Sequence, residues 1–167
     1  VAQSASKISF AFDMAAGDAA KGFMVIKNAM GITIKETNSV MDAMNAATNK
    51  FGGKASSLVT FMAKGGASAA STLKVSGENM QAFGNALQVV GQSGEESATI
   101  MKRFQKAIMG NDELSAMFVK AGGGAKGLIT ILEKAKASGN AFSWLNKRDV
   151  GEYSNAVAQL AMNMDTA

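Results

Sequence analysis

Apolar residues between Leu73 and Met109 recur at the spacing of two consecutive helices. The first stripe consists of Met80, Phe83, Leu87 and Val90, and the second of Ile100, Phe104 and Ala107. Residues three or four positions apart lie on one face of a helix, so each stripe predicts an amphipathic helix with a buried side. We therefore expect two helices that pack their apolar faces into a common core.

Polar residues and glycines mark the ends of these two helices. Ser76 is a favourable N-cap, because its hydroxyl can accept a hydrogen bond from a free backbone N–H of the first turn. Ser93 and Glu96 have the spacing of a capping box for the second helix. Gly91 and Gly110 stand where the two helices are expected to end.

The same spacing predicts helices on the N-terminal side. Residues 5–30 form the longest pattern, a heptad-like seam that Gly31 ends. The seam consists of Ile8, Phe12, Ala15, Ala19, Gly22 and Ile26. Thr33 and Glu36 predict a capping box for a helix over about 34–51, and a shorter helix is expected over 54–64. The Ala/Ser run that ends at Thr72 fits either a short helix or a compact loop.

Further helices are expected after residue 110. Asn111 or Asp112 can cap a short helix, and residues 125–138 follow as a longer one. Its inward positions are expected to be Leu128, Ile131, Leu132 and Ala135. Trp144 falls near a predicted loop. A second heptad-like face then runs through Val150, Tyr153, Val157, Leu160 and Met164.

These elements predict an all-α protein. We expect a multi-helix array or bundle of short antiparallel helices with glycine-punctuated turns, flanked by longer heptad-like helices. The expected organisation is an N-terminal long helix over 1–33, a helical core over 34–138 and a C-terminal helical segment over 139–167. The first residue is Val, so we interpret the chain as a piece of a longer protein.

Composition narrows the chemistry that is expected. The 167 residues include no Cys, no His and no Pro, which excludes disulfides, thiolate or imidazole metal ligands, and Ser-His or Cys-His nucleophile systems. We expect no catalytic, cofactor-binding or metal-binding residues, and no enzyme activity. The run Gly122–Gly127 lacks the spacing of a phosphate loop, and Glu95 with Glu96 suits a helix N-terminus better than a catalytic pair.

The distribution of charged residues indicates a few candidate partner contacts. The formal net charge is +4, and residues 1–75 hold eight basic against four acidic side chains. Lys102, Arg103 and Lys106 lie on adjacent turns of one helix, where they either complement its C-terminal end or contact an acidic surface or DNA. Trp144 is the only tryptophan and fits either core packing or an interface anchor.

The chain also resembles the core region of phage tail tape measure proteins, over roughly residues 34–138. The matching residues are Asp42 and Asn45, Gly65 and Gly66, Leu73 and Ser76, Ala82, Gly84 and Ala86, Gly91, and Glu95–Thr99. These positions are helix caps and small residues. The segment after Gly139 departs from the family pattern, so nothing is carried over to it.

The resemblance implies a structural protein of the virion, made in the host cytoplasm and placed in the lumen of the tail tube. Such a protein sets tail length during assembly and leaves before the DNA at infection. The partners it implies are the tail tube protein, tail assembly chaperones, baseplate or tail-tip proteins and further copies of the chain, with host membrane contact as a candidate and no sequence-specific nucleic-acid binding. The alternative is a membrane-active or pore-forming helical protein at the host envelope, which liposome leakage would distinguish from an inert tail module.

Overall fold

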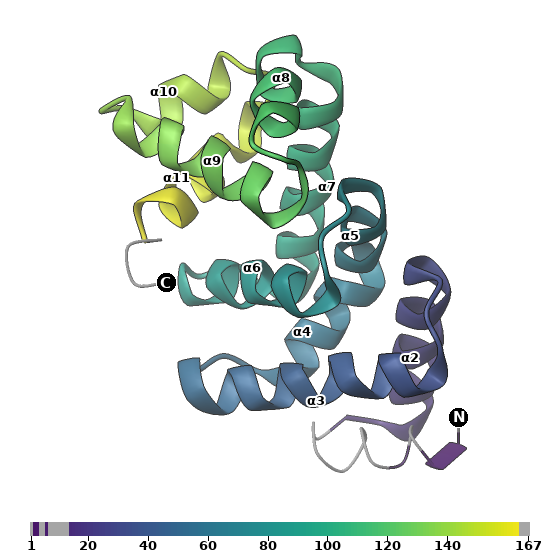
Figure 1. Ribbon diagram of the computed structural model, residues 1–167. Coiled ribbons are helices and arrows are strands. Elements are labelled where there is room, and N and C mark those ends of the chain that lie inside the picture. The colour runs from purple at the N-terminus through teal and green to yellow at the C-terminus, as the bar shows by residue number, and fades with distance from the viewer. Residues whose placement is uncertain (1, 4–5, 7–13, 164–167) are drawn as a thin grey trace.

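The computed structural model describes residues 2–3, 6 and 14–163, and this part of the chain contains helices but no β-strand (Figure 1). The all-α prediction is confirmed. The helices are α2 (Ala16–Met30), α3 (Ile34–Phe51), α4 (Ala55–Phe61), a π-helical segment η1 (Met62–Gly66), α5 (Ala67–Leu73), α6 (Gly77–Val89), α7 (Gly94–Gly110), α8 (Asp112–Lys120), α9 (Gly124–Ala137), α10 (Ala141–Asn146), a 3-10 turn η2 (Gly151–Tyr153) and α11 (Ser154–Met162).

Local capping explains where half of the described α-helices begin. The Glu96 backbone N–H donates to the Ser93 hydroxyl at 3.1 Å, and the Ser93 N–H donates to the Glu96 carboxylate at 2.8 Å. Thr33 and Glu36 form the same reciprocal pair at the start of α3. Ser76 accepts from an N–H in the first turn of α6, as predicted. Each cap satisfies backbone donors that a helix start leaves without partners.

The segment from Ala55 to Leu73 is one continuous helical rod. The predicted helix over 54–64 continues through η1 into α5, so the Ala/Ser run is helical. In η1 the helix widens to π geometry for one turn. This widening places Gly66 beside Phe61, because residues five apart become neighbours in a π turn. A Cβ at Gly66 would lie 2.7 Å from the Phe61 ring.

Helix α7 is the long central element of the molecule. Figure 1 shows α8–α11 gathered around one end of α7, while α4, η1 and α5 pass along the rest of it. Helix α2 packs on α5 and η1, α3 lies against α6 and α4, and α11 packs on α9 and α10. The two groups of helices are therefore joined through α7.

The core between these helices is built where glycines allow close approach. Phe61 is fully buried, and a Cβ at Gly84 of α6 would lie only 2.3 Å from its ring. At the start of α7, a Cβ at Gly94 would lie 2.4 Å from the Ser57 carbonyl oxygen of α4. These glycines let a helix backbone lie directly on an aromatic ring or on another backbone.

Three local predictions need correction. The pattern over 5–30 is not one helix, because α2 begins at Ala16 after extended backbone at Ala15; Ile8 and Phe12 lie outside the described residues. The second heptad-like face is not a long helix, because left-handed backbone at Asp149 and Gly151 precedes the 9-residue α11; Met164 lies outside the described residues. Trp144 lies within α10, not in a loop. The division at residues 33 and 139 stays a prediction.

Candidate functional site

The three basic residues of α7 do not form one cluster. Lys102 and Lys106 are exposed and lie four positions apart, on one face of the helix. The Lys102 stem crosses η1, since a Cβ at Gly65 would lie 2.8 Å from its Cε atom. Arg103 points elsewhere: its guanidinium Nη2 lies 3.0 Å from the position of a Cβ on Gly151. Helix α7 thus sends its neighbouring cations toward two different parts of the fold.

Arg103 is a packed residue more than a free surface charge. It is partly buried, and its Nε has no hydrogen-bond partner among the described groups. It lies over Gly151, whose φ of 66° also favours glycine. Arg103 therefore helps hold the turn before α11 against α7, and its role as a partner contact stays a prediction.

The structure does not support the interpretation that Lys102, Arg103 and Lys106 complement the C-terminal end of their helix. Helix α7 ends at Gly110, and its last turn contains no basic side chain. The field of a helix end falls off within one turn, so Lys102 and Lys106 lie too far back to complement it strongly. The two lysines remain exposed cations with no helix-end role.

Trp144 takes part in a polar contact between α10 and α8. The Arg148 guanidinium carbon lies 4.1 Å from the centre of the Trp144 ring, which is a cation–π distance. Arg148 also donates to the Trp144 carbonyl at 3.0 Å and pairs with the Glu113 carboxylate at 2.9 Å. The indole is half-buried and packs against the core, and its role as an interface anchor stays a prediction.

Sequence reasoning missed Arg148 and Glu113, although a signal was available. Trp144 and Arg148 are four positions apart, the spacing at which helical neighbours meet. A second bond reinforces the corner, because the Asn111 amide donates to the Asp149 carboxylate at 2.9 Å. This corner joins the start of α8 to the turn after α10 and faces solvent, since Glu113 is 65% exposed.

A groove of about 710 Å³ lies on the opposite part of the molecule, between α2, α4, η1 and the start of α7. Its walls include Lys21, Lys64, Asp18 and Glu95, so both signs of charge are present. Its floor includes Gly22, where a Cβ would lie 2.7 Å from a methyl group of Val59. The groove is open and of mixed polarity, without a convergent set of catalytic groups.

The remaining chemistry-bearing motifs have structural roles. Glu96 is held in the capping box of α7, while Glu95 lines the groove. Gly122, Gly123 and Gly124 all have positive φ and form the turn between α8 and α9. Among the described residues no group of three or more Asp or Glu side chains is arranged to hold a metal ion. Hydrogen bonds from the Thr33 backbone and then the Thr33 hydroxyl lower the pKa of Glu36, as its capping role requires.

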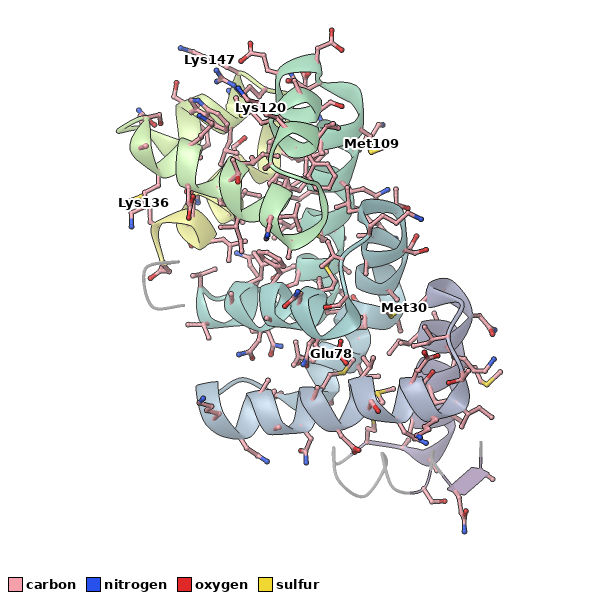
Figure 2. The ribbon with its side chains drawn as sticks, in the orientation of Figure 1. Met30, Glu78, Met109, Lys120, Lys136 and Lys147 are labelled. Carbon is pink, nitrogen blue, oxygen red and sulfur yellow. The ribbon has the colours of Figure 1, made fainter. Side chains whose placement is uncertain are left out.

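The helices α8–α11 carry both signs of charge in nearly equal number, and the charges are dispersed. Figure 2 shows Lys120, Lys136 and Lys147 spread over this group of helices, with Met109 projecting at the end of α7. Met109 is 60% exposed. Across the described ranges, no helix combines the length and the apolar content that crossing a bilayer requires.

Comparison with known proteins found one informative similarity. The model of a family described as phage-related minor tail protein matches residues 1–167. The search of curated proteins and the search of solved structures returned no match.

Proposed function

The chain belongs to the phage-related minor tail protein family, and from this premise we propose that it is a compact module of a tail tape measure protein. Membership makes it a structural component of the phage tail. The resemblance of residues 34–138 to tape measure cores supports the finer assignment, in which the parent protein lies in the tail tube lumen, sets tail length and leaves before the DNA. We propose no catalytic role.

The length of the described helices supports the proposal that the module is compact. The longest described helix of uninterrupted α geometry, α3, has 18 residues and spans about 27 Å at 1.5 Å per residue, and the rod from Ala55 to Leu73 is of similar length. In contrast, residues 34–138 drawn out as a single helix would span roughly 160 Å. The described helices instead fold back on α7 and bury a continuous core. A folded module of this kind adds little ruler length, so its role in the tail is that of an assembly or docking domain.

The partners that we propose follow from this placement. The tail tube protein, the tail assembly chaperones and the baseplate or tail-tip proteins are the expected contacts, together with further copies of the chain. Lys102 and Lys106 are the exposed cations of α7 and suit an acidic wall of the tube. The Trp144 ring lies against Arg148, so we propose that Trp144 contributes to partner contacts only as part of the corner that the two residues form.

The test is an in-frame deletion of residues 34–138 in the phage gene, with tails measured by electron microscopy. A compact module that assembly needs predicts that tails are lost or vary in length. Tails shorter by roughly 160 Å would instead show that the segment is an extended ruler, which keeps the tape measure assignment and refutes the compact one. Tails of normal number, length and infectivity would refute both. Duplication of residues 34–138 is the matched control, because an extended ruler then lengthens the tail by the same amount.

A further inference from the structure

Helix α3 is anchored to the molecule by an unusually poor interface. Among the side chains of α3 that the structure describes, which exclude that of Phe51, the buried stripe holds three large apolar residues, Val40, Met41 and Met44, with the buried threonines Thr37 and Thr48 on either side. The Thr37 hydroxyl donates to the Thr33 carbonyl and the Thr48 hydroxyl donates to the Met44 carbonyl, so both bonds stay within or next to α3. The ends of the stripe therefore contribute no such bond to the helix they face.

The facing side of α6 is also polar. Gly77 contacts α3, because a Cβ there would lie 2.8 Å from a methyl group of Val40. Gln81, Asn85 and Gln88 continue the same helical face at intervals of four and three residues. Gln81 and Asn85 are each 5% exposed, and neither side-chain oxygen has a hydrogen-bond partner; the Gln88 amide nitrogen lacks one as well.

The unsatisfied amides weaken the interface between α3 and α6. A buried polar group without a partner opposes the closed state, because it loses its bonds to water and gains none in the protein. The Gln88 carbonyl accepts one bond, from the Lys54 N–H at 3.2 Å. Swinging α3 away hydrates all three amides, so opening recovers hydrogen bonds that the closed state lacks.

The connections of α3 allow such a movement. Gly31 before it and Gly52 after it have φ values of 64° and 87°, and nothing lies within 4 Å of a Cβ position at either residue. Gly53, with φ of 91°, follows directly. The Phe61 ring is held by contacts with Gly66 of η1 and Gly84 of α6, which do not involve α3 and remain in place when α3 moves.

We propose that α3 is a hinged helix that opens away from α6 while the rest of the chain stays folded. The opening runs from Gly31 to Gly53 and exposes the amide row of α6. It gives the chain a second, locally opened state that is reached without global unfolding. This inference rests on the contacts of α3 alone and stands whether or not the tape measure assignment is correct.

Native-state hydrogen exchange on the full chain tests the proposal. Backbone amides in the middle of α3 should exchange at least about tenfold faster than those of α7. Their exchange rate should also depend less on denaturant concentration, because the opening of α3 exposes less surface than global unfolding does. Helix α2 is the control for fraying from the N-terminus, and it should keep its protection. Equal protection and equal denaturant dependence in α3 and α7 would overturn the proposal, as would joint opening of α2 and α3.

A disulfide provides the matched variant, since the chain has no cysteine of its own. Val40→Cys with Gly77→Cys places two Cβ atoms near disulfide distance across the α3–α6 interface. Oxidation should slow exchange in α3 to the rate of α7, and reduction should restore it. Exchange in α3 that is equally fast in both redox states would overturn the proposal. If the double variant does not fold, the exchange pattern of the parent chain still decides.

Discussion

Replacement of Gly84 by alanine tests whether glycines in these helices are packing sites. A Cβ at this position would lie 2.3 Å from the Phe61 ring, and ordinary contact begins at 3.4 Å, so the ring must move by 3.4 − 2.3 = 1.1 Å. The ring is fully buried, and its Cε1 atom also lies 2.7 Å from the Cβ position of Gly66. The ring is therefore closely approached by the backbone of both Gly66 and Gly84, which restricts its movement.

The expected magnitude follows from two opposing effects. Overpacking a well-filled core costs about 1–3 kcal/mol, and the confined ring places this site near the upper end. Alanine returns about 1 kcal/mol through its higher helix propensity. The net loss is then about 2 kcal/mol in the free energy of unfolding, or a melting temperature lower by roughly 4–8 °C for a chain of this size.

The assay is urea unfolding followed by circular dichroism, with thermal melting as a second readout. Gly110→Ala is the matched control, because Gly110 ends α7 with nothing within 4 Å of its Cβ position, and it should be neutral or stabilising by up to about 1 kcal/mol. Phe61→Leu in the Gly84→Ala background should recover part of the loss through coupling between the two sites. A Gly84→Ala variant as stable as the parent would refute the reasoning.

Three further predictions concern caps and the α8–α10 corner. Ser93→Ala should lower the free energy of unfolding by about 1 kcal/mol in urea titration, and an unchanged midpoint would contradict the cap. Arg148→Ala should lower it by about 1 kcal/mol or less, because Glu113 is mostly exposed, and Arg148→Lys should recover only part of it. The lowered pKa of Glu36 means that its stabilising effect is present at neutral pH and is lost as the pH falls through the folded-state pKa. Stability measured against pH should thus fall less steeply on the acid side in Glu36→Gln than in the parent.

The helix boundaries could be predicted from sequence because they depend on neighbouring residues. Caps such as Ser93 with Glu96 act within one turn, so the pattern alone contains the information. The π turn at Met62–Gly66 could not be predicted in this way. It depends on where α7 crosses the rod, since a Cβ at Gly65 would lie 3.1 Å from the Ala98 carbonyl oxygen. That contact joins segments far apart in the sequence.

The candidate partner contacts show a second limit of prediction from sequence. Lys102 and Arg103 are adjacent, and successive helical residues point about 100° apart, so their divergence was available from helix geometry. The burial of Gln81 and Asn85 was not, because an apolar pattern assigns amides to the solvent side. Only the position of α3 over α6 shows that these side chains are enclosed, and this enclosure is the basis for the proposed opening.

Glycines have two opposite structural roles in this chain, and the position of each glycine decides which role it has. Glycines at Gly31, Gly52 and Gly91 have positive φ and open surroundings, so they act through the backbone at turns. Gly84 lies inside α6 against a ring and Gly94 lies at the start of α7 against a carbonyl, so both act by lacking a side chain. A glycine-rich composition would suggest a loose fold, yet the second group permits the closest helix contacts of the core. Looseness is expected where glycines of the first group flank a helix whose interface also holds unpaired polar groups, and α3 combines Gly31 and Gly52 with the unpaired amides of the facing helix α6.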